Sequence, residues 1–282
     1  MSSTQRRWLT LFAATAAILM VFIIRTIMAR AGTPPRLFDI FDTAISLASL
    51  GVVVVGWRTL SRTNWLISVG AGLLVAILLP LATLYSPYPF LEIVTDVRVR
   101  AVINGVMIVV TTLGGLVIMH WGGPITLQFA SMGWRRAVRS LLFGVAVGLP
   151  FAILNGFANA WTQNRPITWQ NPLAAAIDAL HPAVLEEVIY RFAFLGLLWL
   201  LFRRDWPNRH AVVLSGLLAL LTHTYSHYSE LFVTQPLTAL AMGAVMGLIW
   251  GIPPTLLAVR RDLESALSFH WIQDVIRFWL GF

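Results

Sequence analysis

Long apolar runs separated by short polar segments make up most of the chain. Several runs reach 18 residues or more, the length that a helix needs to cross the hydrocarbon core of a bilayer. Backbone polar groups in a bilayer must be satisfied within their own segment, so these runs predict helices. The expected fold class is all-α, a polytopic transmembrane helical bundle with about eight to nine spans. The expected spans cover residues 8–24, 37–57, 65–85, 101–119, 138–158, 181–202, 211–227, 236–251 and 263–280.

The pattern of long runs is interrupted between residues 122 and 134, which begin with Gly122-Gly123-Pro124 and are too short to form a span. We place an internal boundary there. Residues 1–134 are predicted to form N-terminal transmembrane helices, about four spans, and residues 135–282 a second helical bundle. Within that bundle Gly243, Gly247 and Gly251 recur every four residues, a spacing that predicts close contact with a neighbouring helix.

Composition supports a membrane protein. Hydrophobic residues make up 58% of the chain and charged residues only 11%, whereas soluble domains carry about 25% charged residues. The net charge is +8 and every basic residue is arginine, but the arginines lie in short loops beside apolar runs. That placement indicates anchoring at the cytoplasmic face of a cell membrane, and we expect no nucleic-acid partner. The absence of cysteine excludes disulfides and thiolate metal sites.

The segment that begins the sixth expected span carries unusual charge for a membrane helix. Glu186, Glu187 and Arg191 precede an otherwise apolar run. Ionisable groups at this depth cost at least roughly 2.5–3.5 kcal/mol each on insertion scales, so they indicate a functional site. Glu187 and Arg191 are four residues apart and are predicted to pair on one helix face. Glu186 is rotated by about 100° and needs a partner from elsewhere in the chain.

Two further spans carry polar residues one helical turn apart. The seventh has His223 and His227, and the ninth has His270 and Asp274. A carboxylate and imidazoles that meet inside a bundle suit the activation of a water molecule, with glutamate accepting the proton and histidine orienting the water or stabilising the oxyanion. Each histidine alone could instead form an interhelical hydrogen bond. Intramembrane Glu and His also build the proton relays of carriers.

These residues carry a family resemblance. Glu186 to Arg191 matches the motif EExxxR, Ala219 to His223 occupies the place of FxxxH, and His270 to Asp274 matches HxxxN/D. In this order they resemble the three motifs of the CPBP family, which groups CAAX prenyl endopeptidases with bacteriocin-processing and self-immunity proteins. The resemblance covers roughly residues 138–282 and implies a prokaryotic plasma-membrane protein whose second bundle is catalytic.

The resemblance also implies roles for these residues. Glu186 would be the general base and His223 would help to hold the water, while His270 and Asp274 would face the oxyanion. Glu187 and Arg191 would support the site as a buried pair. Two positions depart from the family pattern: Ala219 replaces an aromatic residue, and Asp274 stands where Asn is common. An ionised Asp cannot donate a hydrogen bond to an oxyanion.

The resulting prediction is an intramembrane endopeptidase that uses glutamate- and histidine-activated water on a membrane-associated protein or peptide substrate, including CAAX-type substrates. No cofactor is expected, although Glu186, His223 and His270 are acceptable zinc ligands. A non-catalytic immunity or scaffold protein of the same fold, and a proton-coupled carrier, are the alternatives. The arginine pattern places the site in the outer half of the membrane, whereas CAAX endopeptidases receive substrates from the cytosol.

Overall fold

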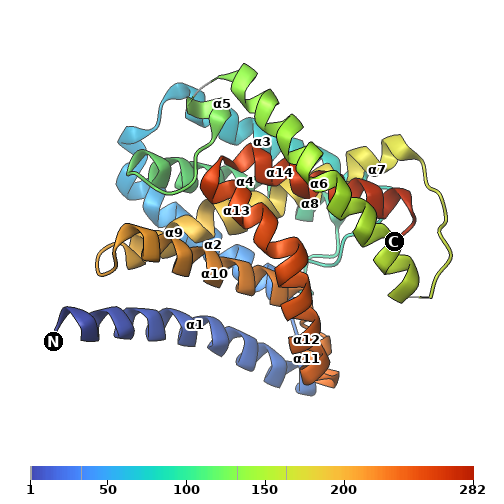
Figure 1. The fold of residues 1–282 in the computed structure, drawn as a ribbon, viewed down its shortest axis with the longest axis horizontal. Helices are drawn as coiled ribbons and strands as arrows, with labels where there is room; N and C mark the ends of the chain where they lie inside the picture. Colours follow the sequence, from blue (N-terminus) through green and yellow to red (C-terminus); the bar gives the residue numbers. More distant parts are fainter. Residues whose placement is uncertain (1, 33, 132, 163) are drawn as a thin grey trace.

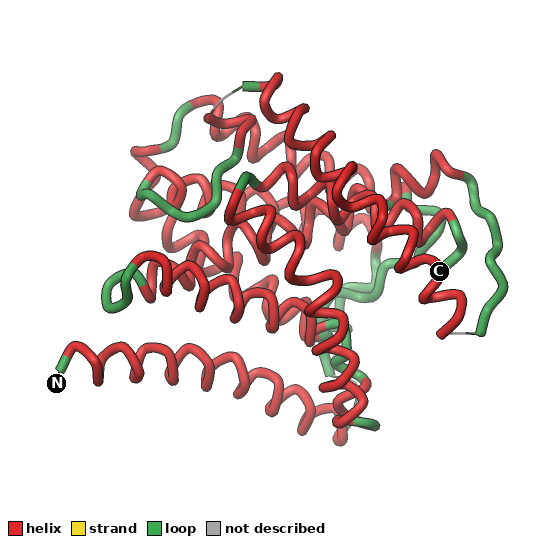
Figure 2. The backbone as a smooth tube through the Cα atoms, in the orientation of Figure 1, coloured by secondary structure: helices red, strands yellow, loops and turns green. Residues whose placement is uncertain are grey.

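The structure, a computed structural model, describes residues 2–32, 34–131, 133–162 and 164–282 (Figures 1 and 2). Within these ranges every regular element is a helix, and β-type pairing is limited to one isolated bridge between Phe90 and Val94. The expected all-α fold class is confirmed. The elements are α1 (Ser3–Ala31), α2 (Leu37–Gly56), η1 (Trp57–Thr59), α3 (Arg62–Leu81), α4 (Val97–His120), α5 (Gln128–Ser131), α6 (Trp134–Thr162), α7 (Pro172–Asp178), α8 (Leu180–Glu186), η2 (Glu187–Phe194), α9 (Leu195–Phe202), α10 (Asn208–Ser226), α11 (Leu231–Thr234), α12 (Pro236–Met246), η3 (Gly247–Gly251), α13 (Ile252–Arg260) and α14 (Leu263–Trp279).

Among the described residues, six helical segments are long and apolar enough to cross a membrane. They correspond to the first, second, third, fourth, fifth and eighth expected spans. The other three expected spans are α8–η2–α9, α10 and α14, and these are the segments that carry Glu186, His223 and His270. The polar residues that mark the site therefore also weaken the hydropathy signal of the helices that hold it.

The sixth expected span is helical, but it is not a regular α-helix throughout. Residues Glu187–Phe194 form a π-helix between the α-helical segments α8 and α9. π-Helical turns inside α-helices are rare and often occur at functional sites. A second π-helical segment, Gly247–Gly251, joins α12 to α13 just before Pro253 and Pro254.

The helix contact predicted from the glycine spacing is present. A Cβ atom on Gly243 would lie 2.1 Å from a ring carbon of Tyr225, and one on Gly251 would lie 3.1 Å from the hydroxyl of Thr224. Both neighbours belong to α10, so the glycines allow α12 and η3 to approach the helix that carries His223.

The core joins the N-terminal helices to the second bundle. Phe41 of α2 and Leu116 of α4 belong to the same buried hydrophobic cluster as Tyr190 and Phe192 of η2. Phe38 of α2 also packs edge-on against Tyr190, with ring centroids 5.9 Å apart. The boundary expected between residues 134 and 135 stays a prediction, but helices from both sides of it surround the π-helix.

Helix α1 lies alongside α10 and is attached mainly near its ends (Figure 1). Only 6% of its most apolar window is buried. At its start, Nε of Arg7 donates to the carbonyl of Asp205. Near its end, Arg25 is 1% exposed, donates to the carbonyl of Ser229 over 2.7 Å and pairs with Glu230. This second attachment fixes the turn that follows α10.

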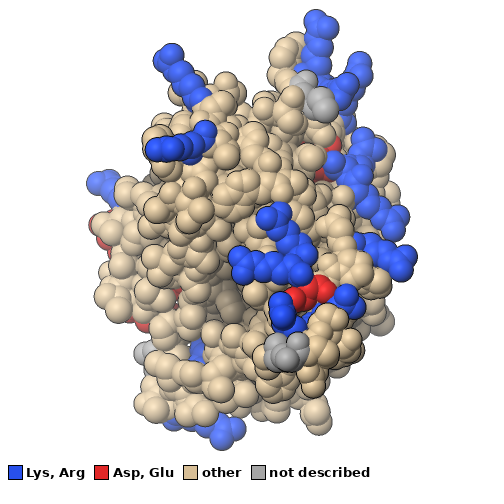
Figure 3. All heavy atoms as spheres, turned by 90° about the vertical axis from the view of Figure 1, so that its left-hand side faces the viewer, with Lys and Arg blue, Asp and Glu red and all other residues tan. Residues whose placement is uncertain are grey.

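Several of the short arginine-bearing loops, which the arginine pattern places in the cytoplasm, gather at one end of the bundle. Arg7 contacts the 203–205 loop, Nη1 of Arg203 donates to the carbonyl of Trp121, and the Thr126 hydroxyl donates to the carbonyl of Arg261. Figure 3 views this end and shows many exposed arginine side chains. The opposite end holds the last turns of α6, α10 and α14. Fewer arginines lie towards that opposite end, among them Arg30, Arg36, Arg98 and Arg165, so the end in Figure 3 carries more of the positive charge.

Candidate active site

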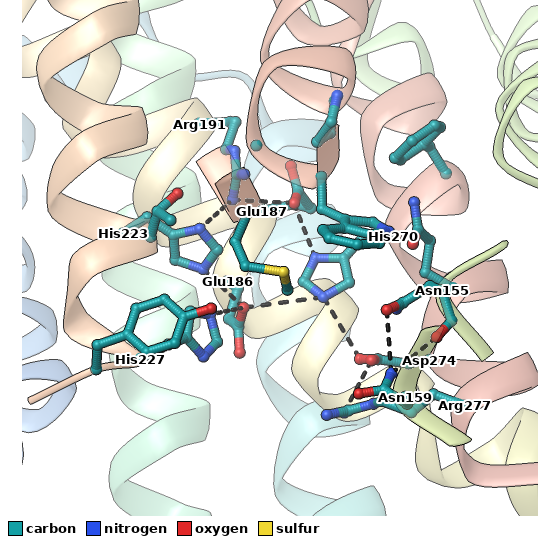
Figure 4. A pocket seen from close by; sticks show the side chains of 18 residues that line it. Asn155, Asn159, Glu186, Glu187, Arg191, His223, His227, His270, Asp274 and Arg277 are labelled. Carbon is teal, nitrogen blue, oxygen red and sulfur yellow. Dashed lines mark hydrogen bonds and ion pairs between the residues drawn. The ribbon is translucent and has the colours of Figure 1, made fainter. Parts of the chain in front are cut away.

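A cavity of about 240 Å³ lies between η2, α10 and α14, and α6 and the α12–η3–α13 segment complete its wall (Figure 4). The structure brings the sequence-predicted residues together around it: Glu186, Glu187, Arg191, His223, His270 and Asp274. These side chains come from three helices that are distant in sequence. The cavity lies towards the arginine-poor end, because His227 directly follows the last residue of α10 and Asp274 is near the end of α14.

Glu186 finds its partner on α10. Its Oε2 lies 2.7 Å from Nε2 of His223, and the glutamate side chain is 17% exposed while the histidine is nearly buried. On the other side of the ring, Nη1 of Arg191 lies 3.0 Å from Nδ1 of His223. A guanidinium can only donate, so Nδ1 must accept. The proton of the neutral ring then sits on Nε2, which donates to Glu186.

Glu187 is fully buried and contacts both Arg191 and the second histidine. Its Oε1 lies 3.1 Å from Nη1 of Arg191 and 2.9 Å from Nδ1 of His270. A carboxylate only accepts hydrogen bonds, so Nδ1 of His270 carries a proton. Arg191 lies between His223 and Glu187 in Figure 4. The pair predicted from four-residue spacing therefore also orients two histidines on other helices.

His270 directs its other ring nitrogen into the cavity. Nε2 lies 3.4 Å from Oδ2 of Asp274 and 3.8 Å from Oε2 of Glu186. Asp274 has a second partner, because its Oδ1 lies 2.9 Å from Nη2 of Arg277. The acidic residue at the position where the family often has Asn is thus charge-balanced by an arginine one turn later.

Several residues of the cavity were not assigned to it from the sequence. His227, which shares a helix face with His223 but received no role from the sequence, has Nε2 3.8 Å from Oε2 of Glu186. Tyr228, Asn155, Asn159 and Arg277 also line the cavity. The spacing of four between the two asparagines, and of three between Asp274 and Arg277, was a usable signal that each pair shares a helix face. Burial raises the pKa of Tyr228, in the turn after α10, to about 12, so its phenol stays protonated at neutral pH.

Aromatic packing around His223 comes from other helices. Ala219 is buried and provides no ring, but the ring of Tyr190 lies 4.7 Å and that of Phe38 5.8 Å from the imidazole. Phe38 also contacts His227, with centroids 4.7 Å apart. Helix α2 therefore contributes to the site, which the sequence motifs did not indicate.

Comparison with known families matches residues 168–276 to type II CAAX prenyl endopeptidase Rce1-like proteins. This region is therefore similar to that family. The match runs from the segment before α7 into α14 and contains all three motifs, which confirms the CPBP resemblance. Comparison with curated proteins and with solved structures gives no significant match.

The match and the fold together support a membrane protease in general terms. The matched family is one of prenyl endopeptidases, and the chain carries several helices that can span a bilayer. The matched family implies membrane-associated protein substrates. The residue roles and the particular substrate are taken up below as proposals.

One group of described side chains has the geometry for a metal ion. Ligand atoms of Glu186, His223 and His227 all lie within 4.8 Å of one another. This group contains His227 where the sequence suggested His270, whose Nδ1 is bonded to Glu187. A carboxylate and two imidazoles are common zinc ligands. The Arg191 contact opposes metal binding, because a neutral His223 whose Nδ1 accepts from Arg191 holds its proton on Nε2, the nitrogen that faces Glu186.

Proposed function

We propose that this chain is an intramembrane endopeptidase in which Glu186 is the general base. The observation that carries the proposal is the 2.7 Å contact between Glu186 Oε2 and His223 Nε2. His223 donates to this oxygen, so the contact orients the carboxylate. Glu186 is the partly exposed carboxylate at the cavity, in contrast to the fully buried Glu187. A positioned carboxylate beside a water molecule is suited to accept its proton during attack on a carbonyl.

In the proposed reaction, water loses a proton to Glu186 while its oxygen attacks the carbonyl carbon of the scissile peptide bond. The carbonyl electrons move to oxygen, and the resulting oxyanion accepts a hydrogen bond from Nε2–H of His270 in its imidazolium form. Glu187 and Asp274, which contact its two nitrogens, balance the imidazolium charge. Glu186 then gives its proton to the leaving nitrogen as the C–N bond breaks. Donors placed for the oxyanion in a water-poor site are worth several kcal/mol.

Asp274 acts indirectly in this scheme. As a carboxylate paired with Arg277 it cannot donate to the oxyanion. Its Oδ2 lies 3.4 Å from Nε2 of His270, so its charge stabilises the imidazolium and orients the ring while the single Nε2–H turns to the oxyanion. Asp274 is therefore a positioning residue, and the difference from the Asn-containing pattern is compatible with the same chemistry.

The decisive test uses a farnesylated peptide with a CAAX-type C-terminus and the full chain in lipid nanodiscs. Wild-type protein should release the C-terminal fragment, and Glu186→Gln should reduce the rate by about 10²–10⁴-fold without loss of folded protein. Glu92→Gln makes the same chemical change at an exposed loop position and should leave the rate unchanged. Equal cleavage by Glu186→Gln would exclude the assigned base. Folded wild-type protein that cleaves no membrane-associated peptide would favour the scaffold or carrier alternatives.

We also propose that the prokaryotic plasma membrane is crossed with the arginine-rich end inside, so that the cavity lies in the outer half. The chain lacks cysteine, so single cysteines are clean probes. In intact cells, Thr162→Cys at the end of α6 should react with an impermeant maleimide, and Arg204→Cys in the loop before α10 should not. The reverse labelling pattern would place the cavity on the cytoplasmic side.

A further inference from the structure

Arg277 is a cation at the cavity that the mechanism above uses only to balance Asp274. Its side chain is 38% exposed, and one of its nitrogens, Nη2, contacts Asp274 over 2.9 Å. Its Nε is buried and has no hydrogen-bond partner among the residues that the structure describes. A guanidinium offers five N–H donors in a planar fork, and after the Asp274 contact the remaining donors of its two terminal nitrogens can bind a ligand.

The surroundings of Arg277 point to an anionic ligand group. The other cavity arginine, Arg191, contacts both Glu187 and His223. Among the described residues, Arg277 forms an ion pair with Asp274 alone, and its guanidinium packs on the ring of Phe278. Asn155 and Asn159 of α6 lie beside it in Figure 4 and add polar amides to the same part of the cavity. A half-exposed guanidinium flanked by amides suits a carboxylate, which it can bind through two parallel hydrogen bonds.

The distance to the proposed base limits where this carboxylate sits in a substrate. A chain of contacts connects the base to the guanidinium. Oε2 of Glu186 lies 3.8 Å from Nε2 of His270, which lies 3.4 Å from Oδ2 of Asp274. The other carboxylate oxygen of Asp274, Oδ1, lies 2.9 Å from Nη2 of Arg277, so the path also includes the width of the carboxylate. Arg277 Nη2 is therefore within about 12 Å of Glu186 Oε2, and an extended peptide covers about 3.3–3.6 Å per residue. A carboxylate on Arg277 lies within about three residues of the attacked bond.

We infer that Arg277 is a specificity-determining residue that binds the free C-terminal carboxylate of a peptide substrate. The inference rests on the proposed peptidase function for its meaning, but binding can be measured without cleavage. Asp274 competes for the same guanidinium, so its removal should strengthen carboxylate binding. An arginine that serves only to stabilise α14 would show no preference between a peptide acid and the same peptide as an amide.

The test compares a fluorescent farnesylated peptide with a free C-terminus and its C-terminal amide, binding to full-length Glu186→Gln protein in nanodiscs. The acid should bind about tenfold or more tightly than the amide, as expected for a charge-assisted hydrogen bond. Arg277→Gln should reduce the ratio of acid-peptide to amide-peptide affinity to about one, chiefly because the acid peptide binds less tightly. Arg277→Lys should restore part of this ratio. Asp274→Asn should raise the ratio. Arg58→Gln, at the opposite end of the bundle, controls for net charge.

Equal binding of acid and amide, no binding of the acid, or a ratio unchanged by Arg277→Gln in folded protein would each overturn the inference. Failure of the proposed function has a different signature, since protein with Glu186 intact would then leave the bound acid peptide uncleaved. If Arg277→Gln does not fold, Arg277→Lys and Asp274→Asn provide the test. The ratio of acid-peptide to amide-peptide affinity must then fall for Arg277→Lys and rise for Asp274→Asn.

Discussion

The α10 and α14 sides of the cavity present similar imidazoles with opposite partners. On α10, Nδ1 of His223 faces Arg191, which can only donate a hydrogen bond. On α14, Nδ1 of His270 faces Glu187, which as a carboxylate can only accept one. His223 is thereby held as a neutral ring, while His270 can carry a proton on both nitrogens. One π-helical turn, through Glu187 and Arg191, assigns different protonation patterns to two histidines on other helices.

This difference explains why a buried ion pair is useful beside the proposed base. Buried pairs are weak evidence for stability, because desolvation offsets much of the attraction. Here each member of the pair contacts a histidine, so the pair determines whether Nδ1 of that histidine accepts or donates a hydrogen bond. The same contacts make the pair a point at which a single substitution disturbs both sides of the cavity.

The largest expected effect comes from breaking the shared pair. Glu187→Ala leaves the buried Arg191 charge uncompensated, which should cost about 3–5 kcal/mol of unfolding free energy. Denaturant unfolding in detergent and the yield of monodisperse protein would measure the loss, with Glu186→Gln as the matched control because it removes the neighbouring charge at a partly exposed position. Well-folded but inactive Glu187→Ala would contradict a chiefly structural role.

A smaller effect should separate the two histidines. His270→Gln keeps a neutral donor but removes the positive charge proposed for the oxyanion, and the cleavage rate should fall about 10²–10³-fold, as for loss of an oxyanion-hole donor. His223→Gln can still donate to Glu186 through its amide, so its rate should fall by only about tenfold. Single-turnover cleavage of the farnesylated peptide measures both. The opposite order would mean that the roles are exchanged.

A still smaller effect is expected for Arg191→Lys. Lysine keeps the positive charge and donates hydrogen bonds, but it lacks the planar fork with which Arg191 contacts Glu187 and His223 together. We expect a loss of about 1–2 kcal/mol in stability and a few-fold lower cleavage rate. Thermal unfolding and single-turnover rates on the same preparation would test this. A rate loss as large as that of Glu186→Gln would show that Arg191 acts on the reaction more directly.

The smallest effect is expected from metal removal. Because Arg191 directs the His223 proton to Nε2, we expect catalysis without zinc and a rate within about twofold after dialysis against a chelator. His227→Ala should also have little effect on the rate, although it removes one member of the only grouping within the described residues that has metal-binding geometry. Stoichiometric zinc together with chelator-sensitive, zinc-restored cleavage would reverse this interpretation and make His227 essential.

Sequence alone determined the features that depend on one helix at a time. Apolar run lengths predicted the helical bundle, four-residue spacing predicted the Glu187–Arg191 pair, and the glycine spacing predicted close approach to a neighbour. Such features follow from the period of the helix, which is the same wherever the helix packs. The three motifs added the candidate site residues, although their spacing could not say which atoms would meet.

Tertiary packing decided the partners across helices. The rotation of α10 and α14 around η2 determines that Glu186 contacts His223, which is 37 residues away, and that Glu187 contacts His270, which is 83 residues away. It also brings Phe38 of α2 and the asparagines of α6 to the cavity, far outside the motifs. These contacts depend on how side chains of several helices fill a shared space, and periodicity along a single helix carries no information on that arrangement.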